Sequence, residues 1–206
     1  MRYFKRMFLG VIICALCCLP VKAEMTIQEL FFDNSKPFHL KILNVIPEDG
    51  IVQIGDDSAK NTIIEFMDYF CGYCKKVHPE LLKLASERDD TRLIFLQHPV
   101  LSESSKLLAN MVVAANKQEK GIEFHNALFE IEGSLNNAKL QQIIEDLEIN
   151  SAKLNIDMSK EEVRNIVSIS SFMASGSGAR GTPTFFVNEE LVVGYMSIDR
   201  IKSLLK

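Results

Sequence analysis

The stretch Thr62-Ile63-Ile64-Glu65-Phe66-Met67-Asp68-Tyr69-Phe70-Cys71-Gly72-Tyr73-Cys74 joins a strand pattern to a pair of cysteines. Residues 62–70 are mostly apolar and partly β-branched, which is typical of a buried strand. From Lys75 to Arg88, apolar residues recur at the spacing of a helix. The two cysteines are therefore predicted to lie where a strand gives way to a helix.

The position of Cys71 determines its expected chemistry. A cysteine at a helix N-terminus faces unpaired backbone N–H groups and the positive end of the helix dipole, which favour the thiolate over the thiol. Cys71 is therefore the expected nucleophile. Cys74 lies three residues later, about one turn deeper, and is close enough to attack a mixed disulfide formed at Cys71. The pair is predicted to carry thiol redox chemistry, with Cys74 as the resolving thiol.

Residues 1–23 differ from the rest of the chain. A basic start over residues 2–6 precedes an apolar run over residues 7–21, and small residues then occupy the cleavage positions before Glu24. A membrane span needs roughly 20 apolar residues, and this run has only 15. We therefore expect a cleaved secretory signal peptide rather than an uncleaved membrane anchor.

Removal of the predicted signal peptide changes the charge and the cysteine content. It takes away four basic residues and no acidic ones, leaving 183 residues with 19 basic and 27 acidic, a net charge of −8. Nucleic acid is an improbable partner, because phosphate neutralisation needs clustered Lys and Arg. Of the five cysteines, Cys71 and Cys74 remain. One closely spaced pair does not make a disulfide-stapled scaffold, and a structural disulfide closing so small a loop would add little stability.

No metal or cofactor is expected. A structural zinc site needs about four nitrogen or sulfur ligands, but there is no second cysteine pair and the four histidines are scattered along the sequence. Haem attachment would need His directly after Cys74, where Lys75 stands. Gly176, Gly178 and Gly181 match the dinucleotide-binding pattern by letter. That pattern requires a strand before it and a helix after it, whereas a helix pattern precedes these glycines and a strand pattern follows.

The rest of the mature chain is typical of an α/β domain with helices inserted in its middle. A second strand is predicted over Arg92–Gln97, and two further strands and a closing helix capped by Ser197 are predicted after Pro183. Between them, from Ser102 to about Ser175, four helices are expected, the last opening on a capping box at Ser159. The strands at the two ends are expected to share one sheet.

Together these features resemble the thioredoxin superfamily and, within it, the DsbA-like disulfide oxidoreductases. The Cys-x-x-Cys pair follows a strand, and Glu65 lies six residues before the first cysteine, where the family has a buried acid. Pro79 lies where thioredoxin-like helices are kinked, and Thr182-Pro183 precedes a strand, as in the family's cis-proline loop. The resemblance spans about residues 50–206 and implies a thioredoxin-like fold with an inserted helical domain.

The chain is accordingly divided into a signal peptide at 1–23, an N-terminal arm at 24–48 and a thioredoxin-like domain at 49–206, with a helical insertion at about 99–178. Within the arm, a helical turn is expected at residues 26–32, and Pro37 and Pro47 are expected to break helical structure.

The resemblance also implies roles for three residues outside the cysteine pair. Glu65, buried beside Cys74, would have a raised pKa and would exchange a proton with this thiol. Pro183 would follow a cis peptide bond, and the backbone of Thr182 would be free to pair with an extended substrate segment.

The dipeptide Gly72-Tyr73 is expected to contact the substrate and to tune the redox potential. Strongly oxidising members of the family carry Pro-His between the cysteines, so the pKa of Cys71 is expected to lie above theirs. Gly-Tyr, with Thr182 before the proline, looks more like the isomerase and reductase branches, whereas the helical insertion looks like the oxidase branch. The direction of electron flow stays open. His78 is expected on the surface of its helix.

The function that the resemblance implies is a periplasmic thiol-disulfide oxidoreductase that forms or rearranges disulfide bonds in exported proteins. Its expected partners are exported proteins with cysteines and a membrane protein that recycles the Cys71–Cys74 pair. The chain is expected to be a monomer, because the arm at 24–48 is short for a dimerising extension. The alternative is a non-catalytic thioredoxin-like module that binds extended peptides and in which the cysteine pair is incidental.

Overall fold

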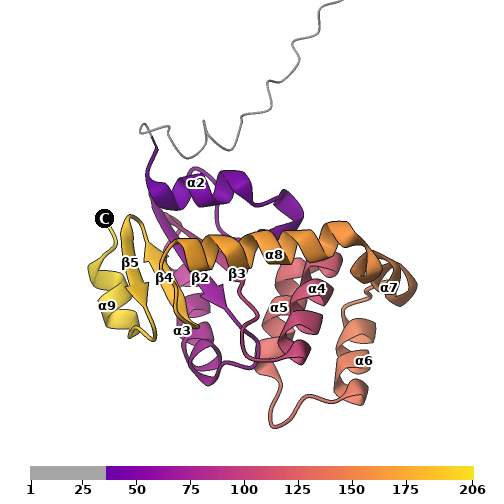
Figure 1. Cartoon of the computed structure of the whole chain (residues 1–206). Coiled ribbons are helices and arrows are strands. Elements are labelled where there is room, and N and C mark those ends of the chain that lie inside the picture. The colour runs from indigo at the N-terminus through magenta and orange to yellow at the C-terminus, as the bar shows by residue number, and fades with distance from the viewer. Residues whose placement is uncertain (1–35) are drawn as a thin grey trace, which may run out of the picture.

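The computed structural model describes residues 36–206 (Figure 1). The predicted signal peptide and the predicted helical turn at 26–32 lie outside this range. Within residues 36–206, no helix combines the length and the apolar character that a membrane span requires.

The centre of the fold is one mixed sheet. Its five strands are β1 (Val52–Ile54), β2 (Asn61–Met67), β3 (Thr91–Gln97), β4 (Thr184–Val187) and β5 (Glu190–Val193), and their spatial order is β1-β3-β2-β4-β5. β2 and β3 are parallel, and every other neighbouring pair is antiparallel. The strands from the two ends of the chain therefore share one sheet, which confirms the predicted α/β fold.

The helices of residues 36–206 are α2 (Phe38–Val45), the short 3-10 helix η1 (Glu48–Gly50), α3 (Gly72–Glu87), α4 (Glu103–Asn116), α5 (Gly121–Glu130), α6 (Asn137–Asp146), α7 (Ser151–Ser159), α8 (Glu161–Gly176) and α9 (Ile198–Ser203). The five helices α4 to α8 lie between β3 and β4 in the sequence, inside the predicted insertion at 99–178.

Each face of the sheet is covered by a different set of helices. Because side chains alternate along a strand, Ile63 and Met67 of β2 pack with α3 on one face, while Ile64 and Phe66 pack with α2 and α8 on the other. Figure 1 shows α8 running from α7 back across the sheet, with α2 alongside it. The layered arrangement encloses β2, whose residues are all buried, and places the segment after it between sheet and helices.

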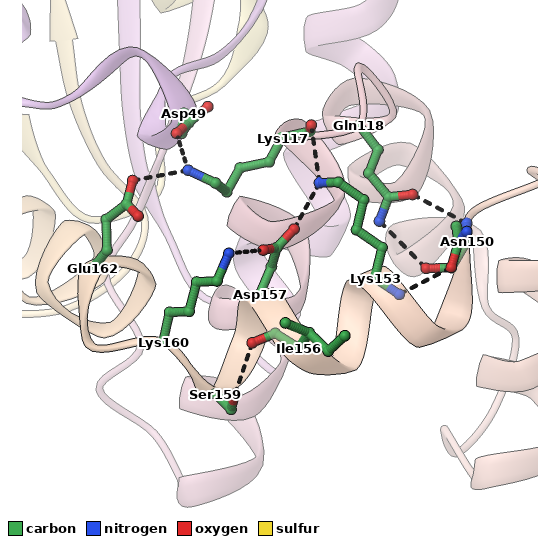
Figure 2. A network of polar contacts seen from close by, with 10 residues as sticks. All are labelled: Asp49, Lys117, Gln118, Asn150, Lys153, Ile156, Asp157, Ser159, Lys160 and Glu162. Carbon is green, nitrogen blue, oxygen red and sulfur yellow. Dashed lines mark hydrogen bonds and ion pairs between the residues drawn. The ribbon is translucent and has the colours of Figure 1, made fainter.

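Ion pairs join the helical insertion to the sheet domain (Figure 2). Lys117, just after α4, contacts Asp49 of η1 at 2.6 Å and Glu162 of α8 at 2.8 Å. Asp157 of α7 is buried and pairs with Lys153 at 2.7 Å and Lys160 at 2.6 Å. The first group connects three elements that are distant in sequence, and the second stabilises the junction of α7 and α8.

Three helix assignments differ from the sequence-based predictions. α2 forms inside the predicted arm, between the two prolines, because Pro37 occupies the N-cap position, where its missing N–H costs nothing. α7 was not predicted, since Leu154 is its one fully buried apolar residue and its apolar stripe is weak. The prediction of a capping box at Ser159 is wrong. Ser159 is the last residue of α7, and its hydroxyl donates to the Ile156 carbonyl.

The closing elements agree better with the sequence. Ser197 caps α9 by accepting a hydrogen bond from the Arg200 N–H, as predicted. β1 was not predicted, because a three-residue edge strand carries too little alternation to be recognised.

Candidate active site

The cysteine pair lies where the sequence predicted it, at the point where β2 gives way to α3. β2 ends at Met67, and a turn closed by a 3.0 Å hydrogen bond from the Cys71 N–H to the Asp68 carbonyl leads into the helix. Cys71 is the N-cap residue of α3, with extended backbone angles and no side-chain cap. Cys74, in the first turn, is completely buried, while Cys71 is 7% exposed. Both are free thiols.

The surroundings of Cys71 favour its thiolate. The pKa of Cys71 is lowered to about 5, chiefly by the hydrogen bond that Cys74 offers its sulfur. Burial acts in the opposite direction, and Thr182 and the backbone N–H groups of Cys74 and Tyr73 add further stabilisation of the anion. These N–H groups belong to the first turn of α3, which is the effect expected of a helix N-terminus.

The second thiol is held in the opposite state. Burial raises the pKa of Cys74 far above its ordinary value, and the interaction with Cys71 raises it further. At neutral pH the pair therefore consists of one thiolate and one thiol, and the thiol stabilises the thiolate. This asymmetry leaves an ionised sulfur at Cys71 and a proton-bearing thiol at Cys74.

Glu65 lies in the middle of β2 and is fully buried. Its neighbours in the sheet are Phe95 and Phe185, so its carboxyl group points to the face covered by α3. Burial raises the pKa of Glu65 to about 8, and the nearby Cys74 thiol opposes only part of this rise. Neither carboxylate oxygen makes a hydrogen bond of good geometry. The predicted burial and raised pKa are thus present, and Glu65 can exchange protons near neutral pH.

The proline loop lies against Cys71. The Thr182-Pro183 peptide bond is cis, and the Cys71 sulfur donates to the Thr182 carbonyl at 3.1 Å. That carbonyl was expected to be free for a substrate segment, but in the dithiol it is engaged by Cys71. The Thr182 hydroxyl oxygen is buried without a hydrogen-bond partner. It is therefore available to donate to Cys71 when the sulfur is ionised.

The dipeptide between the cysteines is exposed, and Tyr73 is 60% exposed. The ring of Tyr73 packs against Tyr195, with 5.5 Å between ring centroids, and Lys76 Nζ lies 4.5 Å from the centroid of the Tyr195 ring. Tyr195 was not among the predicted site residues. No local pattern identifies it, because it follows β5 and reaches Tyr73 only through the pairing of β5 with β4.

The predicted surface position of His78 is wrong. His78 is 2% exposed, because it lies four residues after Cys74 on the buried face of α3. Its ring centroid lies 5.0 Å from that of His125 and 4.6 Å from that of Phe129. His125 is hydrogen-bonded to the Tyr69 hydroxyl at 2.8 Å. Burial lowers the pKa of His78 to about 4, so this aromatic cluster contains neutral imidazole rings.

The histidines that are scattered in sequence are thus partly brought together by the fold. Even so, no three His, Cys, Asp or Glu side chains of residues 36–206 are grouped as a metal site requires.

Comparisons with known proteins agree with this geometry. The family model described as Thioredoxin matches residues 47–206. Disulfide bond formation protein D of Bacillus subtilis is 25% identical over 165 residues, which cover 74% of this chain and 74% of that protein. A thioredoxin-like oxidoreductase from Silicibacter pomeroyi matches with a TM-score of 0.71 and 28% identity, over 77% of this chain and 91% of that structure. The thiol-disulfide exchange protein alpha-DsbA2 of Wolbachia pipientis shares the fold, with a TM-score of 0.68 and 20% identity, over 85% of this chain and 88% of that structure.

Proposed function

Because the chain belongs to the thioredoxin family and is a DsbA-like thiol-disulfide oxidoreductase within it, we propose that it forms or rearranges disulfide bonds in exported proteins through Cys71 and Cys74. The observation that carries this proposal is the asymmetry of the pair. One sulfur has a pKa of about 5 at a helix N-terminus, and its neighbour is buried with a raised pKa.

Acting as an oxidase, the protein starts with a Cys71–Cys74 disulfide. A substrate thiolate attacks the Cys71 sulfur and forms a mixed disulfide, and the Cys74 sulfur leaves with the electron pair of the broken bond. Glu65, which is largely protonated at pH 7, gives this sulfur its proton. A second substrate thiolate then attacks the substrate sulfur of the mixed disulfide and releases Cys71 as a thiolate. Two electrons pass from the substrate to the pair.

Acting as an isomerase, the protein starts in the reduced state, and the Cys71 thiolate attacks a wrongly paired substrate disulfide. The pKa of about 5 at Cys71 falls between the values of about 7 in thioredoxin and about 3.5 in DsbA. A better stabilised thiolate makes the disulfide a stronger oxidant. We therefore infer a redox potential between those two proteins, and a redox titration against glutathione measures it.

The same proposal includes the site of action and the partners. Exported proteins with cysteines are the substrates, a membrane protein recycles the pair, and the protein acts as a monomer in the periplasm. The basic and apolar pattern of residues 1–23 supports export. Detection of the protein in the periplasmic fraction, shortened by about the length of a signal peptide, tests this part.

Substitution of each cysteine tests the assigned roles. Cys71→Ser should abolish insulin reduction and the reactivation of scrambled ribonuclease, because no nucleophile remains. Cys74→Ser should accumulate mixed disulfides with substrates, visible on non-reducing gels, because the resolving thiol is missing. Normal turnover by either variant would contradict the assignment. If the wild-type protein lacked both activities but still bound extended peptides, the non-catalytic binding module would be the correct function.

A further inference from the structure

Asp68, the residue that follows β2, has a buried carboxylate with an unusual set of partners. It is 1% exposed. One carboxylate oxygen accepts the Phe70 N–H at 2.9 Å, and the other accepts the N–H groups of Val100 at 2.9 Å and Leu101 at 3.0 Å. Three backbone donors thus converge on one side chain. Phe70 belongs to the turn before Cys71, whereas Val100 and Leu101 belong to the connection from β3 to α4.

The backbone of Asp68 contacts both cysteines. Its carbonyl accepts the Cys71 N–H at 3.0 Å. Burial is the main reason for the raised pKa of Cys74, and the Asp68 N–H, directed at the Cys74 sulfur, opposes that rise. Any change in the conformation of Asp68 is therefore transmitted to both sulfurs.

The two segments that Asp68 joins leave the same edge of the sheet. β2 and β3 are parallel neighbours, and the His98 N–H continues their pairing by donating to the Met67 carbonyl at 2.9 Å. Beyond this point the strands separate, and the Asp68 carboxylate spans the gap. The segments carry the exposed apolar side chains of Phe70, Val100 and Leu101, which are 46%, 48% and 55% exposed.

We propose that Asp68 is a positioning residue for thiol-disulfide exchange, whose carboxylate holds the turn before Cys71 and the Val100–Leu101 segment together as one rigid substrate-facing unit. This inference rests on the proposed function and deepens it. The buried carboxylate is retained because its three backbone donors replace the water lost on burial. Fixing the turn keeps the Cys71 sulfur over the first N–H groups of α3.

Asp68→Asn is the decisive variant because it conserves the shape of the side chain. A carboxylate only accepts hydrogen bonds, whereas an amide must place its NH2 group against one of the two sets of N–H donors. The turn and the β3–α4 segment can then no longer both be held. Asp157→Asn is the matched control, since Asp157 is also a buried carboxylate but lies in the insertion with Lys153 and Lys160 as partners.

The pKa of Cys71 and the rate of insulin reduction are measured for both variants, with folding checked by circular dichroism. We expect Asp68→Asn to raise the Cys71 pKa towards that of an ordinary thiol and to slow insulin reduction by about tenfold or more. Asp157→Asn should leave both quantities within about twofold of the wild type. An unchanged Cys71 pKa, or a lowered one, would overturn the proposal, because a lowered value indicates that the carboxylate acts only through its charge.

Asp68→Ser provides a second measurement if the asparagine variant fails to fold. A serine hydroxyl can still accept the Phe70 N–H within the turn but is too short to reach Val100 and Leu101. Insulin reduction should fall by about fivefold or more, while the reaction of Cys71 with a small aromatic disulfide is retained. Equal losses in the two reactions, or no loss, would contradict the proposal. A wild-type protein that neither reduced insulin nor reactivated scrambled ribonuclease would instead refute the proposed function itself.

Discussion

At the scale of single residues, Glu65 shows how burial converts an ordinary side chain into a reactive one. Its pKa of about 8 has burial as its main cause, so the carboxyl group is largely protonated at the pH at which exchange takes place. Because folding raises the pKa of Glu65, its contribution to the free energy of unfolding is fully present below the unfolded pKa of 4.5. This contribution is lost as the pH rises through about 8. The residue is therefore expected to improve proton transfer at the expense of stability in neutral and alkaline solution.

Glu65→Gln should separate these two effects. Glutamine cannot exchange a proton with Cys74, so the resolution of mixed disulfides should slow by about 100-fold. The variant should also gain stability relative to the wild type between pH 4.5 and 8, by ~4 kcal/mol. Stopped-flow thiol exchange and urea unfolding at several pH values measure the two quantities. Glu87→Gln, at the exposed end of α3, is the control and should change neither.

At the scale of elements, Lys117 adds an ionic contact to the apolar packing that joins the insertion to the sheet domain. Lys117 follows α4 and is 18% exposed, and its ammonium group contacts Asp49 of η1 and Glu162 of α8, as Figure 2 shows. Hydrogen bonds to these two carboxylates raise the pKa of Lys117 above its ordinary value. A largely buried cation between two anions from different elements contributes more than an isolated surface pair.

Lys117→Met should therefore lower the free energy of unfolding by ~1–2 kcal/mol, because two carboxylates lose their cation. Lys106→Met is the matched control. Lys106 belongs to α4 and pairs with Glu103, but both side chains are more than half exposed. This control should change stability by less than ~0.5 kcal/mol. Denaturant unfolding of the two variants decides the matter, and equal losses would show that the contacts of Lys117 do not join the insertion to the sheet.

At the scale of the whole molecule, the four histidines make the fold sensitive to acid. His39, His78, His98 and His125 are all buried, and burial lowers the pKa of each. Because the pKa of each histidine is lower in the folded protein, the unfolded chain binds protons at a higher pH than the folded chain does. The contribution of the neutral histidines to the free energy of unfolding is fully present above the unfolded pKa of 6.5. It is lost as the pH falls towards their pKa in the folded protein.

His78→Phe should reduce this loss. The wild type should lose ~3 kcal/mol relative to the variant between pH 6.5 and 4, because the folded-state pKa of His78 is about 4. Phenylalanine fits the neighbouring Phe95 and Phe129 rings, and any cost of its larger volume does not depend on pH. Urea unfolding across this pH range measures the difference. Parallel pH curves for the two proteins would show that His78 does not titrate as proposed.

Local sequence was sufficient for much of the fold. The strand predicted at 62–70 forms at Asn61–Met67. The cysteines at the start of a helix and the cap at Ser197 were also predicted, because each depends on residues that are close in sequence. The raised pKa of Glu65 was implied by the resemblance to the family, which has a buried acid at this position. α7 was missed because sequence-based prediction relies on local patterns, and a helix with a weak apolar stripe gives too little local signal.

Only the tertiary structure decided which distant residues surround the two sulfurs. The contact of Asp68 with Val100 and Leu101 depends on β2 and β3 being parallel neighbours, and that of Tyr73 with Tyr195 depends on where β5 pairs. The sequence by itself determined that one cysteine begins a helix, because strand and helix patterns are periodic and local. The groups around that cysteine come from segments about 30 to 120 residues apart, and only the order of the strands brings them together.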